Sequence, residues 1–145
     1  MTTRLYPATA HPGWLEWYPG DGEVFVPTTL GTLLARRESE STARVRLTPA
    51  QTHRNTHGTM HGGAVFAFVD EAMFAGMSVL AEGRRVAGVT IDAQVQFLAP
   101  AELDRPLDAL VEITRETGRM VFQRGLLVQG EARVAAFTGL LRKVA

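Results

Sequence analysis

The sequence predicts an α+β fold in which an antiparallel sheet wraps around one long buried helix. The run from about Gly62 to Glu82 is long enough for several helical turns and apolar on nearly every face, which is typical of a helix surrounded by protein. Segments before and after this run alternate polar and apolar residues with period two, as strands do. Short turns join the later strands, so these strands pair antiparallel.

Composition excludes several classes of protein. The chain has 145 residues, a length that suits one domain with a sizeable core. The 15 Lys and Arg balance the 15 Asp and Glu, which argues against a strongly basic nucleic-acid-binding module. There are no cysteines, so disulfides, Cys-ligated zinc and thiol catalysis are excluded.

The sequence also gives no sign of export or of membrane insertion. The residues from Met1 to Pro7 contain no apolar signal-peptide core. The long apolar helix carries Asp70 and Glu71 at its centre, whereas a membrane span carries few or no charges. We therefore expect a cytoplasmic protein with neither a membrane nor a nucleic acid as partner.

The elements before the helix fall into two parts. Residues 1–29 are rich in Pro, Gly and aromatic residues and are predicted to form an irregular lead-in to a domain that spans residues 30–145. A strand-like pattern begins in this domain, is clearest over Thr42–Leu47 and ends at Pro49. A loop then leads to the helix, for which Gly83 is a suitable C-terminal stop.

Four strands are expected after the helix, and the third and fourth show little polar alternation, which indicates that both of their faces are covered. A turn at residues 117–119 separates the second strand from the third. A single helix can cover one face of a single sheet, so the other face of these strands and the ends of the helix would be uncovered in one chain. We therefore expect a two-fold symmetric oligomer. The four strands are Val89–Phe97, Leu107–Thr114, Met120–Val128 and Arg133–Leu141.

Two glycines mark the start of the predicted helix. The first N–H groups of a helix have no intrahelical partner, and the helix dipole adds positive potential there. Gly62 and Gly63 lack a Cβ, so the oxygen of a ligand can approach these N–H groups closely, as in an oxyanion hole. The alternative is that both glycines only allow a tight turn, and a single His-Gly-Gly sequence does not decide between the two.

Asp70 and Glu71 are the charges in the middle of the apolar helix. A carboxylate near apolar walls has a raised pKa and is more reactive, so we expect one of the two to face a site. The alternative is that both reach solvent along a narrow stripe. Asp70 follows His61 by nine residues, which is about 13 Å along a helix and half a turn around it. If both act on one small substrate, they come from different subunits.

Other catalytic arrangements receive little support. His53, His57 and His61 have a spacing that suits metal binding on a helix, but Asn55 and Gly58 interrupt the segment, so we expect a loop and no metal site. The sequence also lacks a nucleophile elbow, a phosphate-binding P-loop and a dinucleotide-binding fingerprint.

The loop carries Asn55, Gly58, His61, Gly62 and Gly63 at the fixed spacing N-x-x-G-x-x-H-G-G, and Asp70 and Thr90 follow on the helix and the next strand. Together these residues resemble a known family, the hotdog-fold acyl-CoA thioesterases of the PaaI (phenylacetate-pathway) type. The resemblance covers roughly Thr42 to Arg142. The Asp-x-x-x-x-His signature of the hotdog hydratases is absent, as is the early Asp with a following His-Val-Asn of the other large hotdog thioesterase group.

This resemblance implies a role for each residue. The Gly62 N–H donates to the thioester carbonyl, while His61 and Asn55 orient the thioester or the leaving thiol. Asp70 of the partner subunit activates water or attacks the carbonyl itself, and Thr90 holds the water. Both uses of Asp70 stay open.

The implied function is hydrolysis of acyl-CoA to free acid and coenzyme A, with no cofactor because coenzyme A is part of the substrate. Gly63, Gly118 and Arg119 are the candidates for binding the substrate, with Arg119 placed for a phosphate. The implied assembly is a dimer or a dimer of dimers, that is, a homotetramer. The alternatives are a non-catalytic acyl-CoA-binding module and a hotdog acyl-thioester dehydratase or hydratase.

Overall fold

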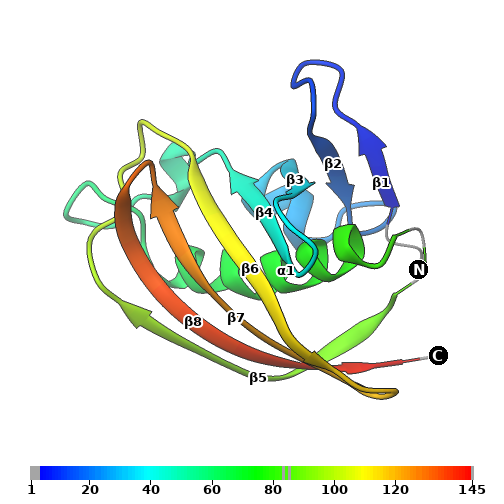
Figure 1. Ribbon diagram of the computed structural model, residues 1–145. Helices are drawn as coiled ribbons and strands as arrows, with labels where there is room; N and C mark the ends of the chain where they lie inside the picture. Colours follow the sequence, from blue (N-terminus) through cyan, green and yellow to red (C-terminus); the bar gives the residue numbers. More distant parts are fainter. Residues whose placement is uncertain (1–3, 83, 85, 145) are drawn as a thin grey trace.

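The computed structural model describes residues 4–82, 84 and 86–144, which form an eight-stranded antiparallel sheet wrapped around one long helix (Figure 1). This arrangement confirms the predicted α+β class. The four strands predicted after the helix are present, each within three residues of its expected ends. The elements are β1 (Arg4–Pro7), β2 (Leu15–Tyr18), the π-helical turn η1 (Val26–Leu30), β3 (Leu33–Arg37), β4 (Thr42–Leu47), the 3-10 turn η2 (Gln51–His53), α1 (Gly62–Leu80), β5 (Gly88–Phe97), β6 (Leu107–Glu116), β7 (Met120–Gln129) and β8 (Ala132–Lys143).

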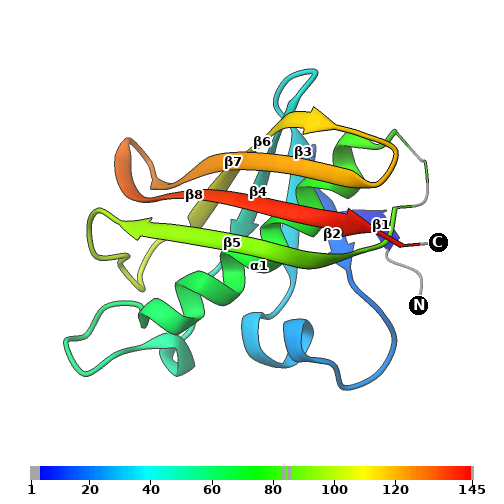
Figure 2. The same cartoon turned by 90° about the horizontal axis from the view of Figure 1, so that it is seen from below.

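The strand order places β5 at one edge of the sheet and β1 at the other. The order is β1-β2-β3-β4-β6-β7-β8-β5, and every neighbouring pair is antiparallel. After α1 the chain enters β5, which pairs with β8 alone among the strands of the chain. Figure 2 shows α1 running along the inner face of the curved sheet. The far edge of β5 therefore keeps unpaired backbone groups.

The helix α1 begins where the two glycines predicted. His61 is the N-cap in an extended conformation (φ −62°, ψ 136°), and its Nδ1 accepts a hydrogen bond of 2.8 Å from the Gly63 N–H. By length and composition α1 could cross a membrane, but one of its sides packs into the core of this sheet, as in a core helix. It ends at Leu80, and the stop predicted at Gly83 lies outside the described residues.

Within one chain the sheet covers one side of α1, so the cover expected on its other side would have to come from outside this chain. A single sheet covers a single side, and Phe66 on the other side keeps 39% of its surface exposed. The large apolar residues on the uncovered side thus remain in water in one chain. The buried residues of α1 are Val65, Phe68, Val69, Ala72, Met73, Ala75, Gly76 and Met77.

The N-terminal segment predicted as irregular contains a β-hairpin that extends the sheet. β1 and β2 have four residues each, too few to show a clear alternation in the sequence, and β2 pairs with β3. Tryptophans fix the hairpin on both faces of the sheet. Trp14 lies against the guanidinium groups of Arg36 and Arg46, at 4.4 and 4.7 Å from its ring centre, whereas Trp17 is 3% exposed in the core.

Candidate active site

Asp70 and Thr90 meet within one chain. The Thr90 Oγ1–H donates a hydrogen bond of 2.6 Å to Asp70 Oδ1. Asp70 comes from the middle of α1 and Thr90 from the start of β5, so this bond joins the helix to the edge strand. Hydrogen bonds to a carboxylate are short and strong, and this one fixes the orientation of Asp70. In the described part of the chain Oδ2 has no hydrogen-bond partner, which leaves it open to a donor such as water.

A β-bulge in β5 brings Thr90 to the inner face of the sheet. The register shifts between Thr90 and Asp92, so that Thr90 pairs with Leu141 and Asp92 with Leu140. Simple alternation groups Thr90 with Asp92 and Gln94 on the face away from α1. The extra residue, Ile91, reverses this for Thr90, since each one-residue shift moves a side chain to the opposite face. The bulge therefore creates the contact between Thr90 and Asp70.

Glu71, the neighbouring carboxylate, points to another part of the protein. Its Oε1 accepts a hydrogen bond of 2.6 Å from the indole Nε1–H of Trp17. Burial raises the pKa of Glu71, the hydrogen bond from Trp17 opposes this rise, and the negative charge of Asp70 adds to it. The two carboxylates thus have different partners, and the raised pKa expected for a carboxylate in this helix belongs to Glu71.

We expect Glu71→Gln to stabilise the protein at neutral and alkaline pH. A carboxyl whose pKa is higher in the folded than in the unfolded chain contributes its full stability below about pH 4.3, and this contribution is lost as the pH rises through the folded-state pKa. The Gln variant should melt a few degrees higher than the wild type at about pH 8 and close to it near pH 4. Calorimetry at both pH values tests this, and a variant that is less stable at pH 8 contradicts it.

The N-terminus of α1 forms a second group of candidate residues beside a cavity. Gly62 and Asn55 line this cavity of about 370 Å³ together with Phe97, the last residue of β5, and Leu98, which follows it. The Phe97 ring lies close to Gly62, where an added Cβ would be 3.6 Å from Cζ. The Gly62 N–H has no acceptor among the described residues, because the capping His61 side chain takes the Gly63 N–H instead. Gly62 therefore offers a free donor at a helix N-terminus.

Asn55 organises the loop before the helix. Its Oδ1 accepts the N–H groups of His57 and Thr59 over 2.9 and 3.1 Å. Its Nδ2 donates to Thr59 Oγ1 over 2.9 Å and to the Met60 carbonyl over 3.4 Å. These bonds occupy the side chain, so Asn55 fixes the shape of the loop that precedes Gly62.

The histidines of this segment have separate environments. His53 is buried, with Nδ1 accepting the Ala50 N–H over 3.0 Å and Nε2 bonded to the Thr29 carbonyl over 2.6 Å. His61 caps the helix, and His57 is exposed in the loop. In the described ranges no cluster of three His, Asp or Glu side chains is placed to hold a metal ion.

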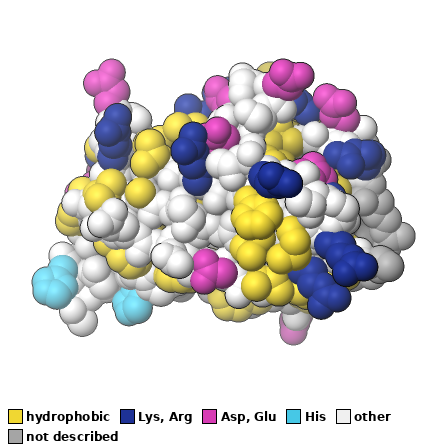
Figure 3. Space-filling view, turned by 60° about the horizontal axis from the view of Figure 1, so that its bottom comes forward, with side chains coloured by type: hydrophobic (Ala, Val, Ile, Leu, Met, Phe, Trp, Pro, Cys, Tyr) yellow, Lys and Arg dark blue, Asp and Glu magenta, His cyan; other side chains and the backbone are white. Residues whose placement is uncertain are grey.

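Gly118 and Arg119 lie in the turn between β6 and β7 and are exposed. The end of β8 holds this turn, since the Lys143 N–H donates to the Arg119 carbonyl over 2.7 Å and Lys143 Nζ to the Thr117 carbonyl over 2.9 Å. Because the same end of β8 pairs with the start of β5, the turn lies on the side of Thr90. Figure 3 shows Lys and Arg side chains at several places on this face, several of them toward its right-hand end, and histidines at its left-hand end.

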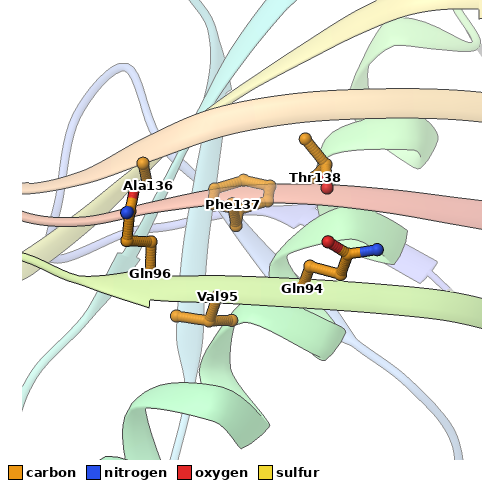
Figure 4. Close-up of a pocket in the computed structure, with 6 residues that line it drawn as sticks. All are labelled: Gln94, Val95, Gln96, Ala136, Phe137 and Thr138. Atoms are coloured by element: carbon orange, nitrogen blue, oxygen red, sulfur yellow. The ribbon is translucent and has the colours of Figure 1, made fainter.

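A separate hollow of about 390 Å³ lies on β5 and β8 (Figure 4). Its polar side chains, Gln94, Gln96 and Thr138, alternate along their strands with residues that pack on the core, so the hollow opens on the face away from α1. None of the predicted site residues lines it. The candidate chemistry therefore belongs to the two ends of the helix segment 62–70 and not to this hollow.

The structure places the candidate residues in two groups, at Gly62 and at Asp70. Eight residues of helix separate them, a distance of about 12 Å along the axis. One group offers a backbone donor for an oxyanion, and the other offers an oriented carboxylate. Sequence reasoning missed the hydrogen bond from Trp17 to Glu71, for which the sequence held no signal.

Comparison with known proteins identifies the fold. A family model described as the thioesterase superfamily matches residues 57–136, more than half of the chain. The comparison with curated proteins gives no match. A conserved protein of Pseudomonas aeruginosa is 25% identical, with 71% of this chain and 81% of that chain covered and a TM-score of 0.63.

Two further solved structures resemble the chain at lower identity. The PaaI protein from the phenylacetic acid degradation operon of E. coli is 21% identical, with 82% of this chain and 83% of that chain covered and a TM-score of 0.68. A hypothetical thioesterase of Streptococcus pneumoniae, solved with coenzyme A, is 18% identical, with 78% and 86% covered and a TM-score of 0.68. These matches confirm the predicted hotdog fold and the resemblance to PaaI-type proteins, and the chain belongs to the thioesterase superfamily.

Proposed function

We propose that this protein hydrolyses acyl-CoA thioesters in sites shared between two copies of the chain. The observation that carries the proposal is the split of the candidate residues into an oxyanion donor at Gly62 and an oriented carboxylate at Asp70, about 12 Å apart along one helix. Neither group alone forms a hydrolytic site. Two-fold symmetry unites the Gly62 of one copy with the Asp70 and Thr90 of the other.

The midpoint between the two groups on α1 and the midpoint between them on β5 indicate the same two-fold axis. Phe66 lies halfway between Gly62 and Asp70 on α1, about 40° from each around the helix axis. On β5, Phe97 lies beside Gly62 and Thr90 beside Asp70, and the point halfway between them is Ala93–Gln94, near the middle of the strand. An axis past Phe66 and the middle of β5 therefore exchanges the two groups in both elements at once.

The surface along this axis is suited to contact a second copy. β5 is a ten-residue edge strand, and a long edge strand with apolar side chains readily pairs with another chain. Val89, Ile91 and Phe97 are each about half exposed, and Phe66 is exposed on the uncovered side of α1. Figure 3, which brings the β5 side of Figure 1 forward, shows hydrophobic side chains gathered on this face. Pairing of two β5 strands covers them.

The proposed reaction needs one donor and one base. Water attacks the thioester carbon while Asp70 accepts one of its protons, and the developing oxyanion receives the hydrogen bond of the Gly62 N–H. The tetrahedral intermediate then loses the thiolate, which takes up the proton from Asp70, and a free acid and coenzyme A are the products. If Asp70 attacks directly, water instead hydrolyses the resulting anhydride. Superfamily membership supports thioester hydrolysis, and the coenzyme A in the Streptococcus pneumoniae structure supports this class of substrate.

Coenzyme A carries phosphates, and the basic turn at Arg119 is the proposed contact for them. Arg119 is exposed and lies on the same side of the chain as Thr90, so one chain would supply both the carboxylate and the phosphate contact. The space beside Gly118 is open for a ligand, since an added Cβ there would meet nothing within 4 Å.

Mixing two inactive variants tests the shared site. Asp70→Asn and Gly62→Pro each remove one of the two groups, and a mixed dimer holds one site with both defects and one intact site. If random exchange gives half mixed dimers, we expect about a quarter of the wild-type activity to return. The two variants are refolded together, and the activity of the mixture in a thiol-release assay should exceed that of either variant refolded alone. Sites that lie within single chains would give no recovery, because every chain carries a defect.

The direct test of the function is a thiol-release assay over a panel of acyl-CoAs and acyl-carrier-protein thioesters. Release of free thiol with equal amounts of acid supports hydrolysis. Tight binding of acyl-CoA without thiol release would replace hydrolysis by a binding module. Reversible loss or gain of water on the acyl chain, with the thioester intact, would indicate a dehydratase or hydratase.

A further inference from the structure

Glu71 is a partly buried acid next to the proposed catalytic carboxylate, and the proposed reaction does not use it. Its side chain faces the N-terminal hairpin, where the Trp17 indole N–H donates to it over 2.6 Å. The hairpin lies outside residues 57–136, the part of the chain that the superfamily model matches. This hydrogen bond therefore joins one residue of a hairpin outside the matched range to one residue of the helix inside it.

We propose that Glu71 and Trp17 form a proton-linked latch that joins the N-terminal hairpin to α1 and adjusts the rate of the chemistry at Asp70. The effect of the latch on the rate rests on the proposed function, whereas the proton-linked contact itself does not depend on it. Glu71 and Trp17 act here as positioning residues, since neither belongs to the group of residues around Asp70 and Thr90 that would touch the substrate.

The surroundings of Glu71 make the energy of its contact with Trp17 depend on whether Glu71 is ionised. The elements packed on this part of α1 bring apolar side chains into the core, among them Leu30 of η1, Leu33 of β3 and Val45 of β4. Within the described chain, Asp70 is the one charged group that acts on Glu71, and Trp17 is its hydrogen-bond donor. When Glu71 is ionised, the indole N–H offsets part of the cost of the buried charge.

The same ionisation acts on Asp70 through the helix. Two negative charges on neighbouring residues repel each other, and this repulsion from Asp70 is one of the causes that raise the pKa of Glu71. An ionised Glu71 therefore favours any step in which Asp70 gives up negative charge, whether by accepting a proton from water or by bonding to the thioester carbon. We expect kcat to rise several-fold across the titration of Glu71, with KM unchanged.

The two tryptophans of the chain allow a direct measurement of the latch. Trp14 and Trp17 are the whole tryptophan content, so Trp14→Phe leaves Trp17 as a single fluorophore at the latch. Trp14 lies against Arg36 and Arg46 and has no described contact with Glu71. In the Trp14→Phe variant, Trp17 emission should change in one step whose midpoint lies above about pH 4.3, the usual value for Glu. Adding Glu71→Gln should abolish this step, because Gln accepts the indole hydrogen bond at every pH.

A second measurement links the latch to the rate. In a thiol-release assay, the wild type and Trp14→Phe should show the rise of kcat in the same pH range as the fluorescence step, and Glu71→Gln should lack it. A fluorescence step that persists in the Glu71→Gln background would refute the latch. A Glu71-dependent step without any change of kcat would refute its effect on Asp70. A wild type with no thiol release but with a Glu71-dependent step would refute the proposed function and the rate effect while the latch stands.

Discussion

Asp70→Asn is expected to lower the kcat of thioester hydrolysis by about 10²–10⁴, the range found when a positioned acid–base group is lost. The Asn side chain keeps the shape of Asp70 and an Oδ1 that accepts the Thr90 hydroxyl, so the bond between α1 and β5 is retained. What the variant loses is the negative charge and the ability to take a proton or attack a carbonyl. KM should change little, because the amide fits the same space.

The matched control for Asp70→Asn is Glu71→Gln, the same change of charge one residue further along the helix. Below about pH 4.3, the usual pKa of Glu, the raised pKa of Glu71 keeps it neutral, and this variant should hydrolyse thioesters at close to the wild-type rate at the same pH. Thiol release measured at saturating substrate compares the two. If Glu71→Gln abolishes activity and Asp70→Asn does not, the assignment of the carboxylates is wrong. If neither change matters, hydrolysis does not use a carboxylate of this helix.

The order and type of the main elements could be predicted from the sequence because their patterns are long. The helix carries apolar residues on nearly every face. Of the strands after it, β5 and β6 have ten residues each, enough to show period two, while β7 and β8 are mainly apolar runs bounded by turns. The hairpin β1–β2 was missed because four-residue strands have no measurable period. Its stability comes from pairing with β3 and from the two tryptophans, which are tertiary contacts.

The sequence could place the candidate site near Gly62 and Asp70 but not the direction of each side chain. Alternation alone puts Thr90 on the outer face, and only the bulge at Ile91 turns it toward Asp70. A bulge adds one residue without a clear sequence signal, so this contact could not be derived from the pattern.

The choice between Asp70 and Glu71 shows a similar limit. Both carboxylates interrupt the same apolar helix, and helical geometry says only that they point about 100° apart. The hydrogen-bond partners distinguish the two carboxylates, because Asp70 accepts from Thr90 and Glu71 accepts from Trp17. Trp17 lies 54 residues before Glu71 in the sequence, and a contact over that separation depends on how the hairpin packs.

Gly62→Pro is expected to reduce kcat by about 10²-fold or more while the fold is retained, because proline removes one backbone donor of the oxyanion hole. The first position of a helix tolerates proline, whose missing N–H has no intrahelical acceptor there. The backbone of His61 is already extended (φ −62°, ψ 136°), as a residue before proline requires. The nearby helical bonds to the His61 carbonyl come from the N–H groups of Ala64 and Val65, which remain.

The control for Gly62→Pro is Gly62→Ala, which adds a Cβ but keeps the N–H. That Cβ would lie 3.6 Å from the Phe97 ring, an ordinary van der Waals contact, so the alanine variant should fold and retain most of its activity. The comparison of kcat between the two variants separates the loss of the donor from crowding beside Phe97. Equal losses in both would mean that the cavity, and not the N–H, limits the reaction. Unchanged turnover in the proline variant, with the oligomer intact by sedimentation, would reject Gly62 as the donor and leave the capped start of α1 with a structural role alone.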